Sequence, residues 1–264
     1  GWGINPNPDH NAIANAHTPS TDLLLKKFPS TILEASGTSV GLPEGYQGSS
    51  EVGHLNIGAG RIVEQEITKI TNNIQDGTFF NSPVFRKAIK NVIDNNSSLH
   101  LMGLVQDEGV HAHQDHLFAI MKHAKQQGVK QLYIHFFADG RDSAPKSTIN
   151  YLRTLKEKID EYGIGEIATF MGRYYAMDRG KEWRLTTTAY DAITKGDGKK
   201  IDSEDRLEDT IQEIYKTKTP NGKDMFDEYI PPLIIGGYEG VKDGDSVIHF
   251  NYRQDRAIQL TMAF

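Results

Sequence analysis

The sequence predicts an α/β protein built on a mostly parallel sheet with helices on both faces. In the larger part of the chain, short β-rich apolar runs alternate with helical patterns of ten or more residues, which is typical of βαβ units. The composition, 38% hydrophobic and 24% charged, is that of an ordinary globular protein. We find no internal repeat and no low-complexity tract, so a repeat architecture is excluded.

The first part of the chain has fewer regular patterns. A helical pattern covers residues 21–28, and a β-like run at 31–35 follows it. Two more helical patterns lie near 63–74 and 84–94, and we take the strandless stretch that contains the first of them as a hinge. The predicted boundaries are 1–64 for a small first part and 65–264 for a larger α/β domain.

The larger part alternates regularly between the two kinds of element. The predicted strands are 99–105, 131–137, 166–170 and 246–250. The predicted helices are 114–127, 146–162, 183–194 and 207–216, with another from about residue 255.

Polar residues follow each of these four strands. In open α/β sheets, ligands bind outside the carboxyl ends of the strands, and arginine presents a planar fork that matches phosphate and carboxylate. We therefore predict a cationic pocket for a small polyanion at this edge of the sheet. The candidate residues are His111, Arg141, Asp142, Arg173, Arg179, Arg253 and Arg256.

Ser50 lies in the segment Gly48–His54, which allows two interpretations. The segment is either a turn in which a serine caps a helix, or a helix N-terminus that stabilises a phosphate or an alkoxide at Ser50. A nucleophilic serine needs a base or a metal ion, and the neighbouring sequence shows no obvious base.

His111 and His113 resemble a zinc ligand pair, but no Cys or carboxylate cluster nearby completes such a site. An imidazole that donates to an anionic ligand is the favoured interpretation for His111. His116 falls on the following helix, where we expect a structural role.

The segment Asp139–Asp142 is either a turn with an internal ion pair or part of a site. In the second case Arg141 binds a carboxylate or phosphate, and Asp142 performs acid–base work on hydroxyl groups. Arg179 has a similar alternative as a surface residue at a helix start.

Charge and composition exclude several classes of protein. A net charge of −6 and a pI near 5.9 argue against broad binding of nucleic acid. No apolar stretch is long enough to span a membrane, and the first residues do not form a signal peptide. The absence of cysteine fits a reducing cytosol. Both ends are abrupt, and we expect the chain to be a fragment of a longer protein.

Taken together, five segments resemble the motifs of the cofactor-independent phosphoglycerate mutases, in the order in which that family has them. The segments are Gly48–His54 with the trailing Leu55–Arg61, Asp107–His113, Asp139–Asp142, Gly172–Arg179 and Asn251–Arg256.

This resemblance implies an alkaline-phosphatase-like domain, of which 1–64 would be a part, and an inserted phosphoglycerate-binding domain at 65–264, truncated at its C-terminus. Ser50 would be the nucleophile that becomes phosphoserine, and also a ligand of one of two divalent ions, usually manganese. Asp142 would be acid and base. The substrate-binding residues would be His111, Arg141, Asp142, Arg173, Arg179, Arg253 and Arg256.

The implied activity is the interconversion of 3-phosphoglycerate and 2-phosphoglycerate in glycolysis and gluconeogenesis, without 2,3-bisphosphoglycerate. We expect a cytoplasmic monomer that binds neither nucleic acid nor membranes. Since only Ser50 of the family's metal ligands is present, we expect this chain to be inactive alone. The alternatives are a related metal-dependent phosphomutase or phosphohydrolase and, for the fragment, a phosphoglycerate-binding module without activity.

The sequence departs from the family motifs at several positions. Ser49 replaces Asn beside the nucleophile, and Gly180 and Glu182 stand where the family usually has Asp and Arg. The others lie around His111, at Gln106, Glu108 and Ala112, of which Glu108 places an extra negative charge beside an anion site.

Overall fold

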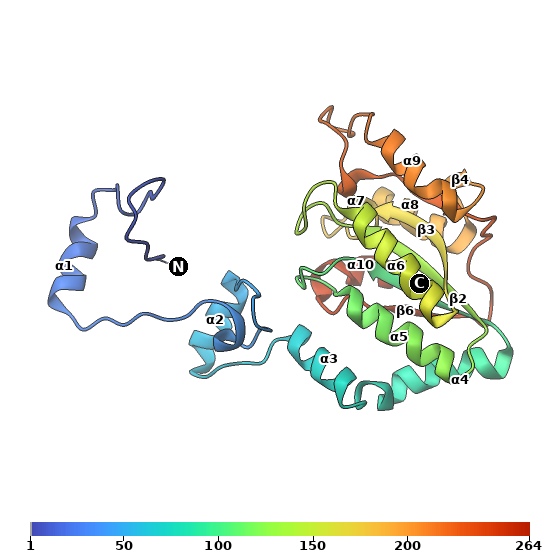
Figure 1. Cartoon of the computed structure of the whole chain (residues 1–264), viewed down its shortest axis with the longest axis horizontal. Helices are drawn as coiled ribbons and strands as arrows, with labels where there is room; N and C mark the ends of the chain where they lie inside the picture. Colours follow the sequence, from blue (N-terminus) through green and yellow to red (C-terminus); the bar gives the residue numbers. More distant parts are fainter. Residues whose placement is uncertain (1) are drawn as a thin grey trace. The chain divides into compact units, whose positions relative to one another are not determined.

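The computed structural model describes residues 2–264, and Gly1, the first residue of the predicted small part, lies outside them. The chain divides into two compact units, 1–65 and 66–264. The second unit contains the sheet (Figure 1).

Unit 1 contains two helices, α1 (Pro19–Lys27) and α2 (Ser50–Ala59), and a short 3₁₀ helix, η1 (Gly37–Val40). The β-like run at 31–35 is not a strand, so that expectation was wrong. Its side chains Ile32 and Leu33 are 71% and 70% exposed. A strand needs a neighbour to satisfy its backbone groups, and the described residues of unit 1 provide one isolated bridge, between Ser36 and Gln47.

Unit 1 has almost no hydrophobic core. Helix α1 buries none of its residues, and Leu24, Leu25 and Phe28 are more than half exposed. A nine-residue helix is marginal in water without tertiary packing. These apolar side chains therefore form a surface that gains stability when another polypeptide surface covers it.

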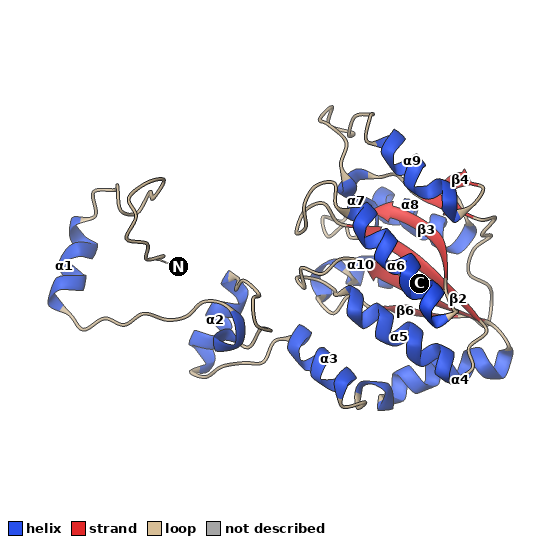
Figure 2. Ribbon diagram, in the orientation of Figure 1, coloured by secondary structure: helices blue, strands red, loops and turns tan. Residues whose placement is uncertain are grey.

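Unit 2 follows the predicted alternation closely (Figure 2). Its helices are α3 (Glu66–Gln75), α4 (Pro83–Asn95), α5 (Gln114–Gln126), α6 (Thr148–Tyr162), α7 (Arg173–Ala176), α8 (Trp183–Lys195), α9 (Leu207–Ile214) and α10 (Ile258–Thr261). Short 3₁₀ helices are η2 (Phe79–Asn81), η3 (Glu204–Arg206), η4 (Asp227–Tyr229) and η5 (Gln254–Arg256). The strands are β1 (Ser98–Leu104), β2 (Gln131–Ala138), β3 (Glu166–Gly172), β4 (Lys199–Ile201), β5 (Leu233–Ile235) and β6 (Ser246–His249).

The six strands form one sheet in the order β4-β5-β3-β2-β1-β6. Strands β6, β1, β2 and β3 are mutually parallel, whereas β5 pairs antiparallel with β3. The predicted α/β class with a mostly parallel sheet is confirmed. Strands β4 and β5 escaped prediction because three residues are too few to show a periodicity.

Helices cover both faces of the sheet. Figure 1 shows α5 and α6 side by side in front of it, with α8 and α10 behind. The apolar runs of the central strands fill the core between these layers, and β1 alone contributes Leu99, Leu101, Met102 and Leu104, each at most 2% exposed.

A chain of hydrogen bonds crosses three central strands on the α8 side. His100 Nε2 lies 3.1 Å from Asp245 Oδ2, His100 Nδ1 lies 3.0 Å from His135 Nε2, and His135 Nδ1 lies 2.9 Å from Thr169 Oγ1. With neutral rings, each Nε2–H donates and each Nδ1 accepts, so every group has a partner. Burial lowers the pKa of both histidines, which keeps them in this neutral form.

The lowered pKa values of the buried histidines predict that the free energy of unfolding decreases at acid pH. Burial lowers the pKa of His100 and His135, and that of His116 to about 4, so the unfolded chain binds protons more readily below pH 6.5. Asp227, whose pKa burial raises to about 6, opposes the effect with one group. Three histidines opposed by one aspartate leave a net two protons, so stability should be complete above pH 6.5 and fall by roughly 3 kcal/mol per pH unit toward pH 4.

Urea unfolding at several pH values from 7 to 5 measures this dependence. His116→Gln removes one titrating group and should make the dependence shallower. An unfolding midpoint that stays constant between pH 7 and pH 5 contradicts the prediction.

Candidate active site

The site lies at the carboxyl ends of the four parallel strands of unit 2. Strand β1 lies between β2 and β6, so the chain leaves β1 toward one side and returns on the other. Ligands bind at such a switch point. The backbone carbonyl of His111, in the loop after β1, accepts hydrogen bonds from the N–H groups of Tyr252 and Arg253, which follow β6. The two loops that flank the switch point are thereby tied together.

The loop after β2 is shaped by Asp139. Its carboxylate accepts the backbone N–H groups of residues 141–143 at 2.9–3.3 Å, so the segment is a turn, as one interpretation held. Gly140 has φ +68°, and a Cβ there would lie 2.8 Å from Cβ of Asp227. The expected internal ion pair is absent, because the two charged side chains pair elsewhere: Arg141 with Glu228 at 3.4 Å and Asp142 with Arg173 at 2.6 Å.

Arg173 is the buried centre of the site. It begins α7 directly after β3, and its residue is 2% exposed. Its Nη1 lies 2.5 Å from Asp139 Oδ1 and 2.6 Å from Asp142 Oδ2. Burial alone would lower the pKa of Arg173, but the two carboxylates outweigh it and raise the pKa. The guanidinium is therefore a fixed positive charge that orients Asp142.

His111 lies beside this pair and is 4% exposed. Its Nε2 lies 3.7 Å from Asp142 Oδ2, and its Nδ1 lies 3.9 Å from Asp255 Oδ1. Burial, and then the positive charges of Arg173 and Arg253, lower the pKa of His111 to about 3. The imidazole is neutral at pH 7, so it can bind an anion as a hydrogen-bond donor but not as a cation.

The remaining arginines come from the loops after β3 and β6. Arg179 Nη1 lies 2.6 Å from Asp255 Oδ2, and Arg253 Nε lies 3.2 Å from Asp255 Oδ1. Arg256 donates to the carbonyl oxygen of Met177 at 3.1 Å. Burial lowers the pKa of Arg256, and so do the charges of three other site arginines. These guanidinium groups therefore lie close enough to repel one another, an arrangement that favours an anion among them.

Glu108 and His113 lie at the margin of the site. Burial, and then the negative charges of three nearby aspartates, raise the pKa of Glu108. Glu108 therefore lies close enough to Asp142 for the two carboxylates to repel each other. His113 caps α5, since its Nδ1 accepts the N–H of Asp115 at 3.2 Å. His111 and His113 thus serve different elements, which disfavours the zinc-pair interpretation. His116 is buried and bonded to Thr71 of α3 at 2.9 Å, consistent with the structural role predicted for it.

Ser50 belongs to unit 1 and is the first residue of α2. The helix cap is Ser49, whose Oγ accepts the N–H of Val52 at 3.3 Å, so the Ser50 hydroxyl has no capping role. Gly48 is required by a close approach of the chain, since a Cβ there would lie 1.9 Å from the carbonyl oxygen of Ala35. The exposed hydroxyl of Ser50 therefore stands at a helix N-terminus.

His54 is a neighbour of Ser50 that the sequence analysis missed, although the spacing of four residues on a helix places them on one face. Its Nδ1 lies 3.2 Å from Ser50 Oγ and 2.7 Å from the Ser50 carbonyl oxygen. A carbonyl only accepts, so Nδ1 carries the proton and cannot act as a base toward Oγ in this geometry. If Ser50 is a nucleophile, its activation requires a group other than His54.

No metal site is formed by the described residues alone. Within residues 2–264, no three His, Asp or Glu side chains are grouped as a metal ion requires. Ser50 is the single metal ligand that the family resemblance places in the chain. These residues therefore do not fit the two-ion site by themselves.

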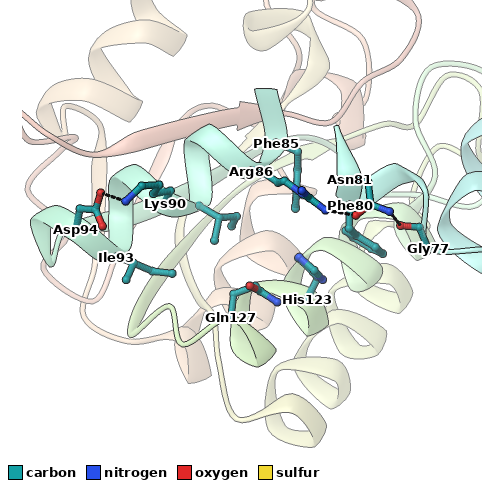
Figure 3. Close-up of a pocket in the computed structure, with 11 residues that line it drawn as sticks. Gly77, Phe80, Asn81, Phe85, Arg86, Lys90, Ile93, Asp94, His123 and Gln127 are labelled. Atoms are coloured by element: carbon teal, nitrogen blue, oxygen red, sulfur yellow. Dashed lines mark hydrogen bonds and ion pairs between the residues drawn. The ribbon is translucent and has the colours of Figure 1, made fainter. Parts of the chain in front are cut away.

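A groove on unit 2 is a different feature from the arginine cluster. It has a volume of about 730 Å³ and is lined by residues of η2, α4 and α5. Figure 3 shows Phe80 and Phe85 close to His123 in it, with the ion pair of Lys90 and Asp94 at its other end. None of the predicted site residues lines it.

Comparisons with known proteins agree on one family. A family model described as "BPG-independent PGAM N-terminus" matches residues 70–264. The 2,3-bisphosphoglycerate-independent phosphoglycerate mutase of Acetivibrio thermocellus is 47% identical over 268 residues, which cover 100% of this chain and 51% of that protein. The same enzyme of Clostridioides difficile is 48% identical over 267 residues, covering 100% and 50%.

A solved structure gives the same result. The crystal structure of Leishmania mexicana phosphoglycerate mutase at low cobalt concentration matches with a TM-score of 0.84 and 30% sequence identity. The match covers 100% of this chain and 49% of that one. The chain therefore spans about half the length of the curated relatives it matches.

Proposed function

Because the chain belongs to the family of BPG-independent phosphoglycerate mutases, we propose that the whole protein interconverts 3-phosphoglycerate and 2-phosphoglycerate. The relatives carry a name that excludes a need for 2,3-bisphosphoglycerate, and we extend this independence to the present protein. Such a reaction belongs to glycolysis and gluconeogenesis.

The observation that carries the proposal is the gathering of four further arginines around the Asp142–Arg173 pair at one edge of the sheet. Phosphoglycerate has a phosphate and a carboxylate, two groups that match the arginine fork. A phosphoryl transfer needs positioning and charge stabilisation more than any other contribution. We assign substrate binding to His111, Arg141, Asp142, Arg173, Arg179, Arg253 and Arg256.

In the proposed reaction, the alkoxide of Ser50 attacks phosphorus, the bond from phosphorus to the C3 oxygen breaks, and Asp142, protonated at the start, gives that oxygen its proton. Glycerate then reorients within the arginine cluster. Asp142 removes the proton of the 2-hydroxyl, whose oxygen attacks phosphoserine and releases Ser50. Arg173 holds Asp142 in place at 2.6 Å, so the same carboxyl group serves as acid and then as base.

The activator of Ser50 is the part of the mechanism that the chain does not supply. We propose two divalent ions, such as manganese, with Ser50 as one ligand and the others from the half of the relatives' length that the chain does not span. A bound cation lowers the pKa of a coordinated hydroxyl and stabilises charge on a phosphoryl group.

The two units correspond, in this proposal, to two domains. Residues 1–64 are part of an alkaline-phosphatase-like domain, which accounts for the exposed apolar side chains of unit 1. Residues 65–264 are the inserted phosphoglycerate-binding domain. We propose a cytoplasmic monomer whose partner is its small-molecule substrate, and which does not bind nucleic acid. In residues 2–264, no helix has the length and apolar character needed to cross a membrane.

The test is an assay of the full-length protein with manganese and 3-phosphoglycerate, without 2,3-bisphosphoglycerate. We expect 2-phosphoglycerate to form. Release of inorganic phosphate from several phosphoesters, without 2-phosphoglycerate, would support the alternative of a related phosphohydrolase. The second alternative, a binding module, requires that the full-length protein binds 3-phosphoglycerate but converts none.

Arg141→Ala should raise the KM for 3-phosphoglycerate about tenfold or more, since a charge-assisted hydrogen bond contributes roughly 1.5–3 kcal/mol. Its side chain is 52% exposed, so the fold should not change. Arg153→Ala is the matched control, because Arg153 is 58% exposed on α6 and pairs with Glu208 outside the site. Equal KM values for the parent and Arg141→Ala would reject the assignment of Arg141.

A further inference from the structure

Asp255 is a carboxylate that contacts three of the residues assigned to substrate binding. Its Oδ2 lies 2.6 Å from Arg179 Nη1, and its Oδ1 lies 3.2 Å from Arg253 Nε and 3.9 Å from His111 Nδ1. These three groups come from the loops after β3, β6 and β1. One side chain thus links three of the four strand ends that form the site.

The contacts with the two arginines leave room for a ligand. Arginine side chains lose rotamer entropy when they are fixed, and a partner that fixes them beforehand removes that cost from binding. Asp255 contacts Arg179 through a single nitrogen, whereas a phosphate recognised by the arginine fork uses two. A carboxylate placed in this way orients the guanidinium without occupying its whole donor face.

The contact with His111 decides which nitrogen carries its proton. The charged groups that face the ring are Arg173, Arg253, Arg256, Asp142 and Asp255. Asp255 lies near Nδ1 and Asp142 lies near Nε2. A neutral imidazole has a proton on only one of its nitrogens, so if one nitrogen donates to its carboxylate, the other presents a lone pair to the second carboxylate. Nδ1 is buried and makes no hydrogen bond in the structure, so a small movement toward Asp255 would satisfy it.

This inference rests on the proposed function. We propose that Asp255 is a positioning residue. It holds Arg179 and Arg253 for the substrate, and it accepts a hydrogen bond from the Nδ1–H group of His111. Nε2 of His111 then accepts a hydrogen bond from the protonated carboxyl of Asp142. The acidic proton lies between Asp142 and His111 before Asp142 gives it to the departing oxygen, and again after Asp142 has taken a proton from the other hydroxyl. One proton leaves Asp142 and one returns in each turnover, so no other reactant is needed.

The experiment uses the full-length enzyme with manganese and measures KM for 3-phosphoglycerate and the pH profile of kcat. Asp255→Asn should raise KM about tenfold, because both arginines lose their partner. It should also move the basic limb of the profile to lower pH by roughly half a unit to one unit, because loss of a negative charge makes the shared proton more acidic. Asp255→Glu keeps the negative charge, so the basic limb of its kcat profile should lie close to that of the parent enzyme.

Asp224→Asn is the control, since Asp224 forms an ion pair with Lys218 while 87% exposed, away from the site. It should match the parent in both measurements, and thermal unfolding of each variant excludes a general loss of folding. An Asp255→Asn enzyme with parental KM and an unmoved basic limb overturns the role of Asp255. A raised KM with an unmoved limb overturns its link to His111. A parent enzyme without mutase activity instead overturns the proposed function, and the role of Asp255 with it.

Discussion

Ser50→Ala in the full-length protein should abolish phosphoryl transfer, lowering kcat by about a thousandfold or more, while the protein stays folded. The proposed reaction passes through a phosphoserine, and alanine has no oxygen to carry the phosphoryl group. The structure separates this effect from stability, because Ser49 and not Ser50 caps helix α2. The arginine cluster belongs to unit 2, so binding of 3-phosphoglycerate should persist.

Ser49→Ala is the control for this variant. It removes the cap and costs about 1 kcal/mol of stability, but it leaves the proposed nucleophile in place. Each protein is incubated with substrate and manganese, and an added phosphate is sought by intact-protein mass spectrometry. We expect the phosphate on the parent and on Ser49→Ala, and not on Ser50→Ala. Near-parental turnover by Ser50→Ala would show that another residue accepts the phosphoryl group.

The sequence predicted the sheet of unit 2 best where its strands are long and apolar. Strand β2, with eight residues of which six are buried, could be identified from its composition and from the helices on either side. The three-residue strands β4 and β5 are defined by their hydrogen-bonded partners and not by a pattern of their own. The same reason explains the error at 31–35, where a β-like composition found no partner strand.

For the site, strand order was the decisive information. Parallel strands end at one edge, so the sequence could predict that Arg141, Arg173 and Arg253 lie near each other. It could not predict which carboxylate each arginine contacts, because that depends on loop conformation and strand register. The pairing of Arg173 with Asp139 and Asp142, and the central place of Asp255, therefore emerged only from the coordinates.

The burial of Arg173 distinguishes it from the other arginines and gives the second large effect. Arg173→Ala in the full-length protein should lose about 3–5 kcal/mol of stability, because it leaves the carboxylate of Asp139, itself 1% exposed, without its cation. It should also lower kcat/KM for 3-phosphoglycerate at least about a hundredfold, since the substrate loses one cation and Asp142 loses the group that orients it.

Arg173→Lys separates the two effects. Lysine keeps the positive charge, so it should recover part of the stability, because one guanidinium nitrogen, Nη1, makes the contacts with both Asp139 and Asp142. The ammonium group lacks the planar fork of N–H donors that matches a phosphate or carboxylate of the substrate. Activity should therefore stay low while the urea unfolding midpoint rises from that of the alanine variant toward that of the parent.

The fold around this position is tight as well, since a Cβ at the preceding Gly172 would lie 2.2 Å from the carbonyl oxygen of Glu228.

If Arg173→Ala unfolds at the parental urea concentration, the buried pair contributes little to stability, and the fold must compensate Asp139 through its backbone N–H donors. If Arg173→Lys instead turns over substrate like the parent, charge alone is sufficient at this position. Asp142 would then be oriented by its own loop, and the role assigned to the guanidinium would have to be abandoned.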